Sequence, residues 1–122
     1  MTSRKIIVID DSQSARFQLR TVLEPLGYTL VEAVDGRDGL RKMQEHPETR
    51  LVFCDVNMPF MDGLQMLEAA PPLLRLDRTF VMVTTETDPL LMQRAKELGA
   101  RGWIVKPFKP EMLVGTVRKI LG

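Results

Sequence analysis

The sequence has little of the side-chain chemistry on which many enzymes depend. It contains one cysteine and one histidine among 122 residues. A single cysteine excludes an internal disulfide, and Cys54 lies inside an apolar run, where we expect it to pack rather than react. His46 precedes Pro47 in a polar stretch, and we predict that it is a solvated loop residue without a functional role. The chain therefore offers no catalytic histidine and no cysteine outside the expected core.

The sequence also lacks an excess of either charge and lacks long apolar runs. Its 17 basic and 16 acidic residues give a net charge of +1, whereas a nucleic-acid-binding surface would show as a basic excess or a basic stripe. No apolar run is long enough to span a membrane, and the N-terminus has no signal-peptide core. We therefore expect a cytoplasmic chain that neither inserts into membranes nor binds nucleic acid directly. Without repeats or linkers, we expect residues 1–122 to form one domain.

What the sequence does contain is a regular alternation of strand-like and helix-like segments. Apolar runs rich in β-branched residues predict strands at 5–9, 28–33, 51–55, 79–84 and 103–105. An apolar stripe at helical spacing follows each run. Such alternation predicts an α/β fold, a doubly wound five-stranded parallel sheet in the flavodoxin-like order 2-1-3-4-5.

Helix-ending signals set the expected limits of these helices. Ser12 and Asp88 are predicted N-caps, and Gly27 is predicted to end the first helix. Pro71 and Pro72 should stop the third helix early and leave residues 73–78 as an irregular connection. The core-facing stripes of the last two helices are expected to comprise Leu91, Met92, Ala95 and Leu98, and then Met112, Leu113, Val117 and Ile120.

Polar side chains follow four of the five predicted strands. Asp10 and Asp11 follow the first, Asp55 the third, Thr84 ends the fourth and Lys106 follows the fifth. In the expected strand order their carboxyl ends meet at the ligand crevice of an open sheet. Crowded carboxylates repel one another, and a hard dication with oxygen ligands, such as Mg²⁺, relieves that repulsion.

This set of groups is suited to phosphoryl transfer. The reaction needs little beyond positioning and charge neutralisation, which Mg²⁺ and Lys106 would supply. Asp55 could form an aspartyl phosphate. Thr84 could hydrogen-bond a phosphoryl oxygen only when one is present, which makes it a candidate sensor of the phosphorylated state.

Four motifs in register resemble the receiver domains of two-component response regulators. They are residues 8–12 (VIDDS), residues 55–59 (DVNMP) with Asp62-Gly63, residues 83–84 (VT), and residues 106–108 (KPF). The similarity covers nearly the whole chain and is strongest to CheY-like, single-domain chemotaxis regulators. The resemblance implies a signalling switch, not an enzyme apart from catalysing its own phosphorylation and dephosphorylation.

The resemblance assigns a role to each residue of the site. It implies that Asp55 accepts a phosphoryl group from the phosphohistidine of a sensor histidine kinase or histidine phosphotransfer protein. It implies that Mg²⁺ is held by Asp10 or Asp11, Asp55 and the backbone carbonyl of Asn57, with one of the acidic residues acting through a water molecule.

The same resemblance assigns the switch. Lys106 would contact the phosphoryl oxygens, Thr84 would act as the switch residue, and Trp103 occupies the place of a rotating aromatic. Trp103 is bulkier than the usual Tyr or Phe, so an inward swing would meet close packing. The Lys106-Pro107 peptide bond is expected to be cis.

The resemblance also implies an output surface on the fourth helix, the fifth strand and the fifth helix, which would bind a downstream protein. The candidate contact residues are Met92, Trp103, Val105 and Lys109. Asn57 and Glu86 are expected to tune hydrolysis of the phosphorylated state, and Thr85 is large enough to narrow access to Asp55.

Two other functions stay open at this point. A Mg²⁺-dependent phosphatase similar to the haloacid dehalogenases would need a second Asp two residues after the nucleophile, where this chain has Asn57. A receiver-like docking module that works without phosphorylation is the other alternative. The sequence ends directly after the last helix, so a receiver clipped from a longer protein is also open.

Overall fold

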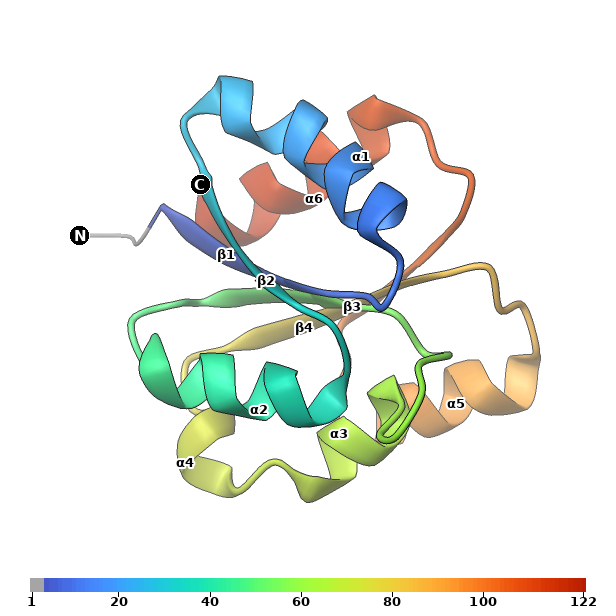
Figure 1. Ribbon diagram of the computed structural model, residues 1–122. Coiled ribbons are helices and arrows are strands. Elements are labelled where there is room, and N and C mark those ends of the chain that lie inside the picture. The colour runs from blue at the N-terminus through green and yellow to red at the C-terminus, as the bar shows by residue number, and fades with distance from the viewer. Residues whose placement is uncertain (1–3) are drawn as a thin grey trace.

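The computed structural model describes residues 4–122 as a single five-stranded parallel sheet between two layers of helices (Figure 1). The strands are β1 (Lys5–Ile9), β2 (Thr29–Ala33), β3 (Leu51–Cys54), β4 (Thr79–Thr84) and β5 (Gly102–Val105). Their spatial order is β2-β1-β3-β4-β5, and every neighbouring pair is parallel. This confirms the predicted doubly wound, flavodoxin-like sheet.

Helices cover both faces of the sheet. On one face lie α1 (Gln13–Leu23), continued by the 3₁₀ turn η1 (Glu24–Leu26), and α6 (Pro110–Leu121) (Figure 1). On the other lie α2 (Gly36–Glu45), α3 (Gly63–Ala69), α4 (Pro72–Arg75) and α5 (Pro89–Glu97). Within residues 4–122 none of these helices has the length and hydropathy needed to cross a membrane.

The central strands are buried on both faces, which explains their nearly continuous apolar sequence. Along β1, Ile6 and Val8 face the core shared with α1 and α6, whereas Ile7 and Ile9 face the core shared with α2, α3 and α5. All four side chains are at most 2 % exposed. Cys54 is also buried, and burial raises the pKa of its thiol well above the usual value, which confirms the expected packing role.

Side-chain caps begin the helices where the sequence predicts them. The Ser12 hydroxyl accepts from the Ala15 N–H at 3.2 Å, and the Asp88 carboxylate accepts from the Leu90 N–H at 2.9 Å. Asp62 and Gln65 form a reciprocal capping box at the start of α3. Gly27 ends η1 with φ of 92°, the left-handed conformation that glycine adopts without steric cost.

Three expectations differ from the structure. Residues 73–78 are not wholly irregular, because Pro72 starts the short helix α4, as proline can at a first helical position. Met112 is 55 % exposed and Met92 is 38 % exposed, so neither belongs to the core stripe of its helix.

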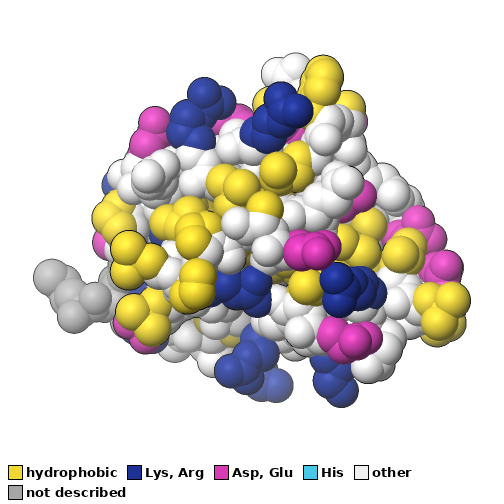
Figure 2. Space-filling view, turned by 90° about the horizontal axis from the view of Figure 1, so that it is seen from below, with side chains coloured by type: hydrophobic (Ala, Val, Ile, Leu, Met, Phe, Trp, Pro, Cys, Tyr) yellow, Lys and Arg dark blue, Asp and Glu magenta, His cyan; other side chains and the backbone are white. Residues whose placement is uncertain are grey.

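Figure 2 shows hydrophobic side chains gathered on the α2–α5 face at the end where α4 lies, and there Leu73 and Leu76 are exposed.

Candidate functional site

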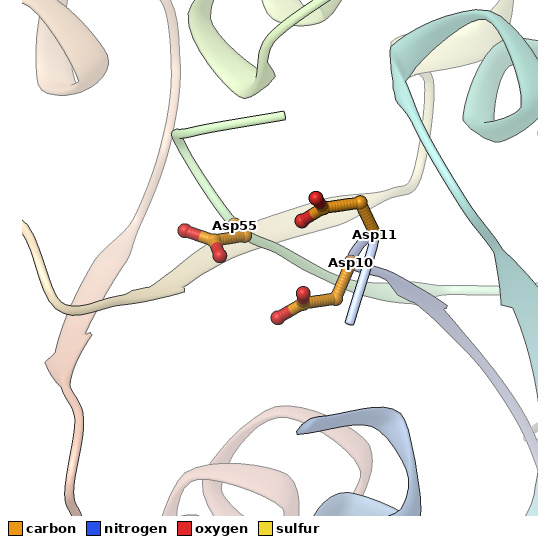
Figure 3. Close-up of side chains that lie close together, drawn as sticks. All are labelled: Asp10, Asp11 and Asp55. Atoms are coloured by element: carbon orange, nitrogen blue, oxygen red, sulfur yellow. The ribbon is translucent and has the colours of Figure 1, made fainter. Parts of the chain in front are cut away.

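Three carboxylates meet at the carboxyl ends of two adjacent strands. Asp10 and Asp11 follow β1, and Asp55 follows β3. One oxygen from each lies within 4.8 Å of the others, and Figure 3 shows the three side chains close together where their strands end. Asp10 is buried, Asp55 half-buried and Asp11 exposed. The structure therefore brings together the three acidic residues that the sequence predicts for the site.

The sheet fixes the backbone of this cluster beyond the last strand residues. The Asp55 N–H donates to the Ile9 carbonyl at 2.9 Å, and the Asp10 N–H donates to the Ala33 carbonyl at 3.0 Å. Gly63 approaches so closely that an added Cβ would lie 2.2 Å from the Asp55 carbonyl oxygen. Only glycine fits at this approach, so the turn after Asp55 depends on it.

Lys106 follows the edge strand β5, and its side chain reaches back to two of the carboxylates. Its ammonium donates to Asp10 Oδ2 at 2.6 Å and to Asp55 Oδ2 at 3.3 Å. Its own backbone N–H donates to the Thr84 carbonyl at 2.8 Å, which places it just beyond β5. The Lys106-Pro107 peptide bond is cis, which confirms the expectation.

Burial and charge set the pKa values within this group. Burial raises the pKa of Asp10 and outweighs the hydrogen bonds from Lys106 and Ser12, which lower it. Burial on its own lowers the pKa of Lys106, but the hydrogen bond to Asp10 and the charges of Asp10 and Asp55 raise it overall. Lys106 is therefore a full cation held between two carboxylates at neutral pH.

The acidic cluster is compatible with Mg²⁺. Clustered carboxylate oxygens at one open edge are the donors that this hard cation prefers, and Mg²⁺ usually keeps several waters as its remaining ligands. Asn57 follows in the same loop, with its N–H directed at Asp55 Oδ1 at 3.4 Å. The Asn57 carbonyl as a further ligand stays a prediction.

A hydrogen-bonded network joins the predicted switch residues beside the cluster. The Thr84 hydroxyl is completely buried and accepts from the Glu86 N–H at 3.2 Å. The Glu86 side chain accepts from the Asn57 side-chain amide at 3.2 Å, and the Glu86 carbonyl accepts from the Trp103 indole N–H at 3.0 Å. Asn57 and Glu86, predicted to tune hydrolysis, therefore touch across the β3 and β4 ends. Thr85, which lies between Thr84 and Glu86 in the chain, is exposed, and its effect on access to Asp55 stays a prediction.

The predicted output surface corresponds to α5, β5 and α6, because α4 is an additional helix in the numbering. Met92 and Val105 are 38 % and 39 % exposed, Lys109 is exposed and Trp103 is half-buried. Met92 and Trp103 line a groove between α5 and β5 with a volume of about 730 Å³. The candidate residues are thus at least partly accessible, and their use by a partner stays a prediction.

The structure adds two residues to the site that the sequence reasoning missed. The Arg16 guanidinium donates to the Asp10 backbone carbonyl at 2.6 Å and to Glu32 Oε1 at 2.8 Å. A charged residue inside a strand, next to the buried Ala33, is the one sequence signal that could have pointed to Glu32.

Comparisons with known proteins agree with this architecture. The response regulator receiver domain model matches residues 6–118. The chain is 34 % identical to a probable chemotaxis protein CheY of Rhizobium etli, covering 97 % of this chain and 92 % of that one. It is 37 % identical to the probable transcriptional regulator ycf27 of Cyanophora paradoxa, of which it covers 49 %.

A solved structure gives the same answer at the level of the fold. The chemotaxis response regulator CheY4 of Vibrio cholerae is similar with a TM-score of 0.87 and 38 % sequence identity, over 98 % of this chain and all of that one. The matched region includes every residue of the acidic cluster, its lysine and its threonine. The chain therefore belongs to the response regulator receiver domain family, the CheY-like, phosphoryl-accepting switches of two-component signalling.

Proposed function

We propose that this chain is a phosphorylation-activated switch in which Asp55 accepts a phosphoryl group from a phosphohistidine. The donor would be a sensor histidine kinase or a histidine phosphotransfer protein. The observation that carries the proposal is the position of Asp55, whose carboxylate lies within 4.8 Å of Asp10 and Asp11 and 3.3 Å from the Lys106 ammonium.

The side chains around Asp55 suit the transfer. An Asp55 oxygen would bond to phosphorus while the phosphorus–nitrogen bond breaks and its electron pair stays on the donor imidazole. Lys106 already contacts Asp55 and would neutralise charge on the incoming phosphoryl oxygens. Asp10, Asp11, Asp55 and the Asn57 carbonyl would hold Mg²⁺, which when bound supplies further neutralisation of phosphoryl charge.

Phosphorylation would reach the surface through the network beside the site. Thr84 is buried and its hydroxyl contacts only the Glu86 N–H among the bonds of the described residues, so it can turn toward a new acceptor on Asp55. That turn would disturb Glu86, whose carbonyl holds the Trp103 indole on the α5–β5–α6 surface. A downstream protein that contacts Met92, Trp103, Val105 and Lys109 would then distinguish the two states.

The test is the intact mass of the protein after brief incubation with acetyl phosphate, with and without Mg²⁺, followed by an acid quench. We expect a Mg²⁺-dependent gain of one phosphoryl group in the wild type and no gain in Asp55→Asn. Asp62→Asn is the matched control, because Asn also caps helices and Asp62 lies outside the cluster. Equal phosphorylation of Asp55→Asn and wild type would show that another residue is the acceptor.

A further inference from the structure

We infer that Arg16, oriented by Glu32, is a positioning residue for the acidic metal pocket. The inference rests on the proposed function, because it concerns how the chain prepares Asp10 and Asp11 for Mg²⁺. The Arg16 side chain bonds to Glu32 and to the Asp10 carbonyl, and it makes no hydrogen bond or ion pair with Asp55 or Lys106. It acts on the backbone from which two successive carboxylates project.

The contact with Asp10 is to the main chain and not to the carboxylate. The Arg16 Nη1 atom lies 2.6 Å from the Asp10 carbonyl oxygen. That carbonyl shares one planar peptide unit with the Asp11 N–H. Holding it therefore fixes the plane that joins the two acidic residues.

The other groups of this segment are held as well. The Asp10 N–H donates to the Ala33 carbonyl at 3.0 Å, and the Ser12 N–H donates to Asp10 Oδ1 at 2.9 Å. Arg16 thus secures the one peptide unit between these two anchors that no strand or cap bond holds. Without it, the Asp10-Asp11 peptide could rotate and carry the Asp11 carboxylate out of the cluster.

Glu32 holds the guanidinium in place for this role. Its Oε1 accepts from Arg16 Nε at 2.8 Å, and its other oxygen pairs with Arg20. The Arg16 and Glu32 side chains are only 12 % and 24 % exposed, so water competes weakly for these bonds. A guanidinium can donate to a carboxylate and a carbonyl together, whereas the single ammonium of lysine is a flexible point charge.

Partners that orient metal ligands fix the geometry in which those ligands meet the ion. Their removal typically lowers metal affinity by about 10- to 100-fold. For Arg16→Ala we expect the Mg²⁺ concentration that gives half-maximal phosphorylation to rise by about tenfold. The rate at saturating Mg²⁺ should stay close to the wild-type rate, because Asp55 and Lys106 are untouched. This division between affinity and rate separates positioning from general loss of structure.

A second readout does not depend on phosphorylation. The melting temperature of a protein rises with any ligand that binds only the folded state, in proportion to the logarithm of its concentration relative to Kd. The Mg²⁺ titration of the melting temperature should therefore move to about tenfold higher concentration in Arg16→Ala. Arg20→Ala is the matched control, since Arg20 pairs with Glu32 from the same helix and makes no hydrogen bond or ion pair with Asp10.

The outcomes divide cleanly. A shift of both midpoints in Arg16→Ala, a smaller shift in Arg16→Lys and none in Arg20→Ala would support the inference. Unchanged midpoints, or a lower maximal rate with unchanged midpoints, would overturn it. If Arg16→Ala does not fold, Arg16→Lys decides, and a wild-type midpoint there is the contrary result. A wild type that neither binds Mg²⁺ nor accepts phosphate would instead refute the proposed function itself.

Discussion

At the scale of single residues, Phe60 has a backbone conformation that a bulky side chain rarely adopts. It lies in the loop after Asp55 with φ of 67°, and the Met61 N–H donates back to the Pro59 carbonyl at 2.7 Å. A positive φ is a genuine outlier for a bulky residue and marks backbone strain, whereas asparagine adopts it more readily. The side chain is 79 % exposed, so packing compensates little of this strain.

Replacing Phe60 with asparagine should therefore stabilise the protein. Asn tolerates the left-handed conformation, whose cost for other residues is about 1–2 kcal/mol. The lost contact with the Arg37 guanidinium, 5.9 Å from the ring centre, is worth about 0.5 kcal/mol at an exposed site. We expect a net gain of about 0.5–1 kcal/mol in the free energy of urea unfolding. Phe17→Asn, at a 59 % exposed site on helix α1, is the comparison and should show no gain.

At the scale of elements, α2 depends on the carboxylates at its start. The helix has ten residues and includes two glycines, so its intrinsic stability is low. Asp35 caps it by accepting from the Asp38 N–H at 2.9 Å. Asp38 in turn accepts from the Val34 N–H at 3.0 Å and from Arg41 at 2.7 Å.

The pKa of Asp38 gives this element a defined pH dependence. Burial raises it, but the hydrogen bonds from Arg41 and Val34 lower it more, and the net shift is downward from 3.8. A lowered pKa means that ionised Asp38 contributes stability above pH 3.8, which is lost as the pH falls through the lowered value. Asp38→Asn should therefore cost about 1 kcal/mol at pH 7 and progressively less in acid, measured by urea unfolding across pH. A constant difference across this range would assign the effect to packing rather than charge.

The elements also show what the sequence could and could not predict. Strand limits and caps are local properties, so the apolar runs and the cap residues Ser12 and Asp88 predicted them closely. Pro71 and Pro72 predicted the end of α3. A signal that ends one helix does not show whether another helix follows, so α4 was missed. The exposure of Met112 was missed because an apolar stripe does not reveal how wide the covered surface is.

The same limit applies to the site. Asp10, Asp11, Asp55, Thr84 and Lys106 were predicted because each stands at the end of a strand, and strand order alone brings them together. Arg16 and Glu32 lie 16 residues apart on a helix and an edge strand, and only their packing shows that they meet. Arg16 contacts Asp10 through a backbone carbonyl, which every residue has, so no residue type at a fixed spacing in the sequence reveals this contact.

At the scale of the whole molecule, the crevice that makes the site also works against the fold. The sheet order brings three carboxylates within 4.8 Å of one another, and Lys106 forms ion pairs with two of them, Asp10 and Asp55. Their repulsion is present in the folded state and absent from the extended chain. A dication bound in the crevice would replace this repulsion with attraction between the ion and the carboxylates. Folding would then be coupled to binding of the ion.

This coupling predicts that Asp11→Asn is at least as stable as the wild type without Mg²⁺ and less stable than the wild type with it. Without the ion, removal of one crowded charge should leave stability equal to wild type or up to about 0.5 kcal/mol higher, because Asp11 is exposed. With Mg²⁺ at ten times its Kd, the wild type should gain about 1.4 kcal/mol and Asp11→Asn much less. Melting temperatures at matched ionic strength would measure both states. Asp77→Asn is the control, since Asp77 lies outside the cluster with φ of 58°, which Asn also tolerates. A variant at Asp11 that gains as much from Mg²⁺ as the wild type would remove Asp11 from the ligand set and leave Asp10 and Asp55 to hold the ion.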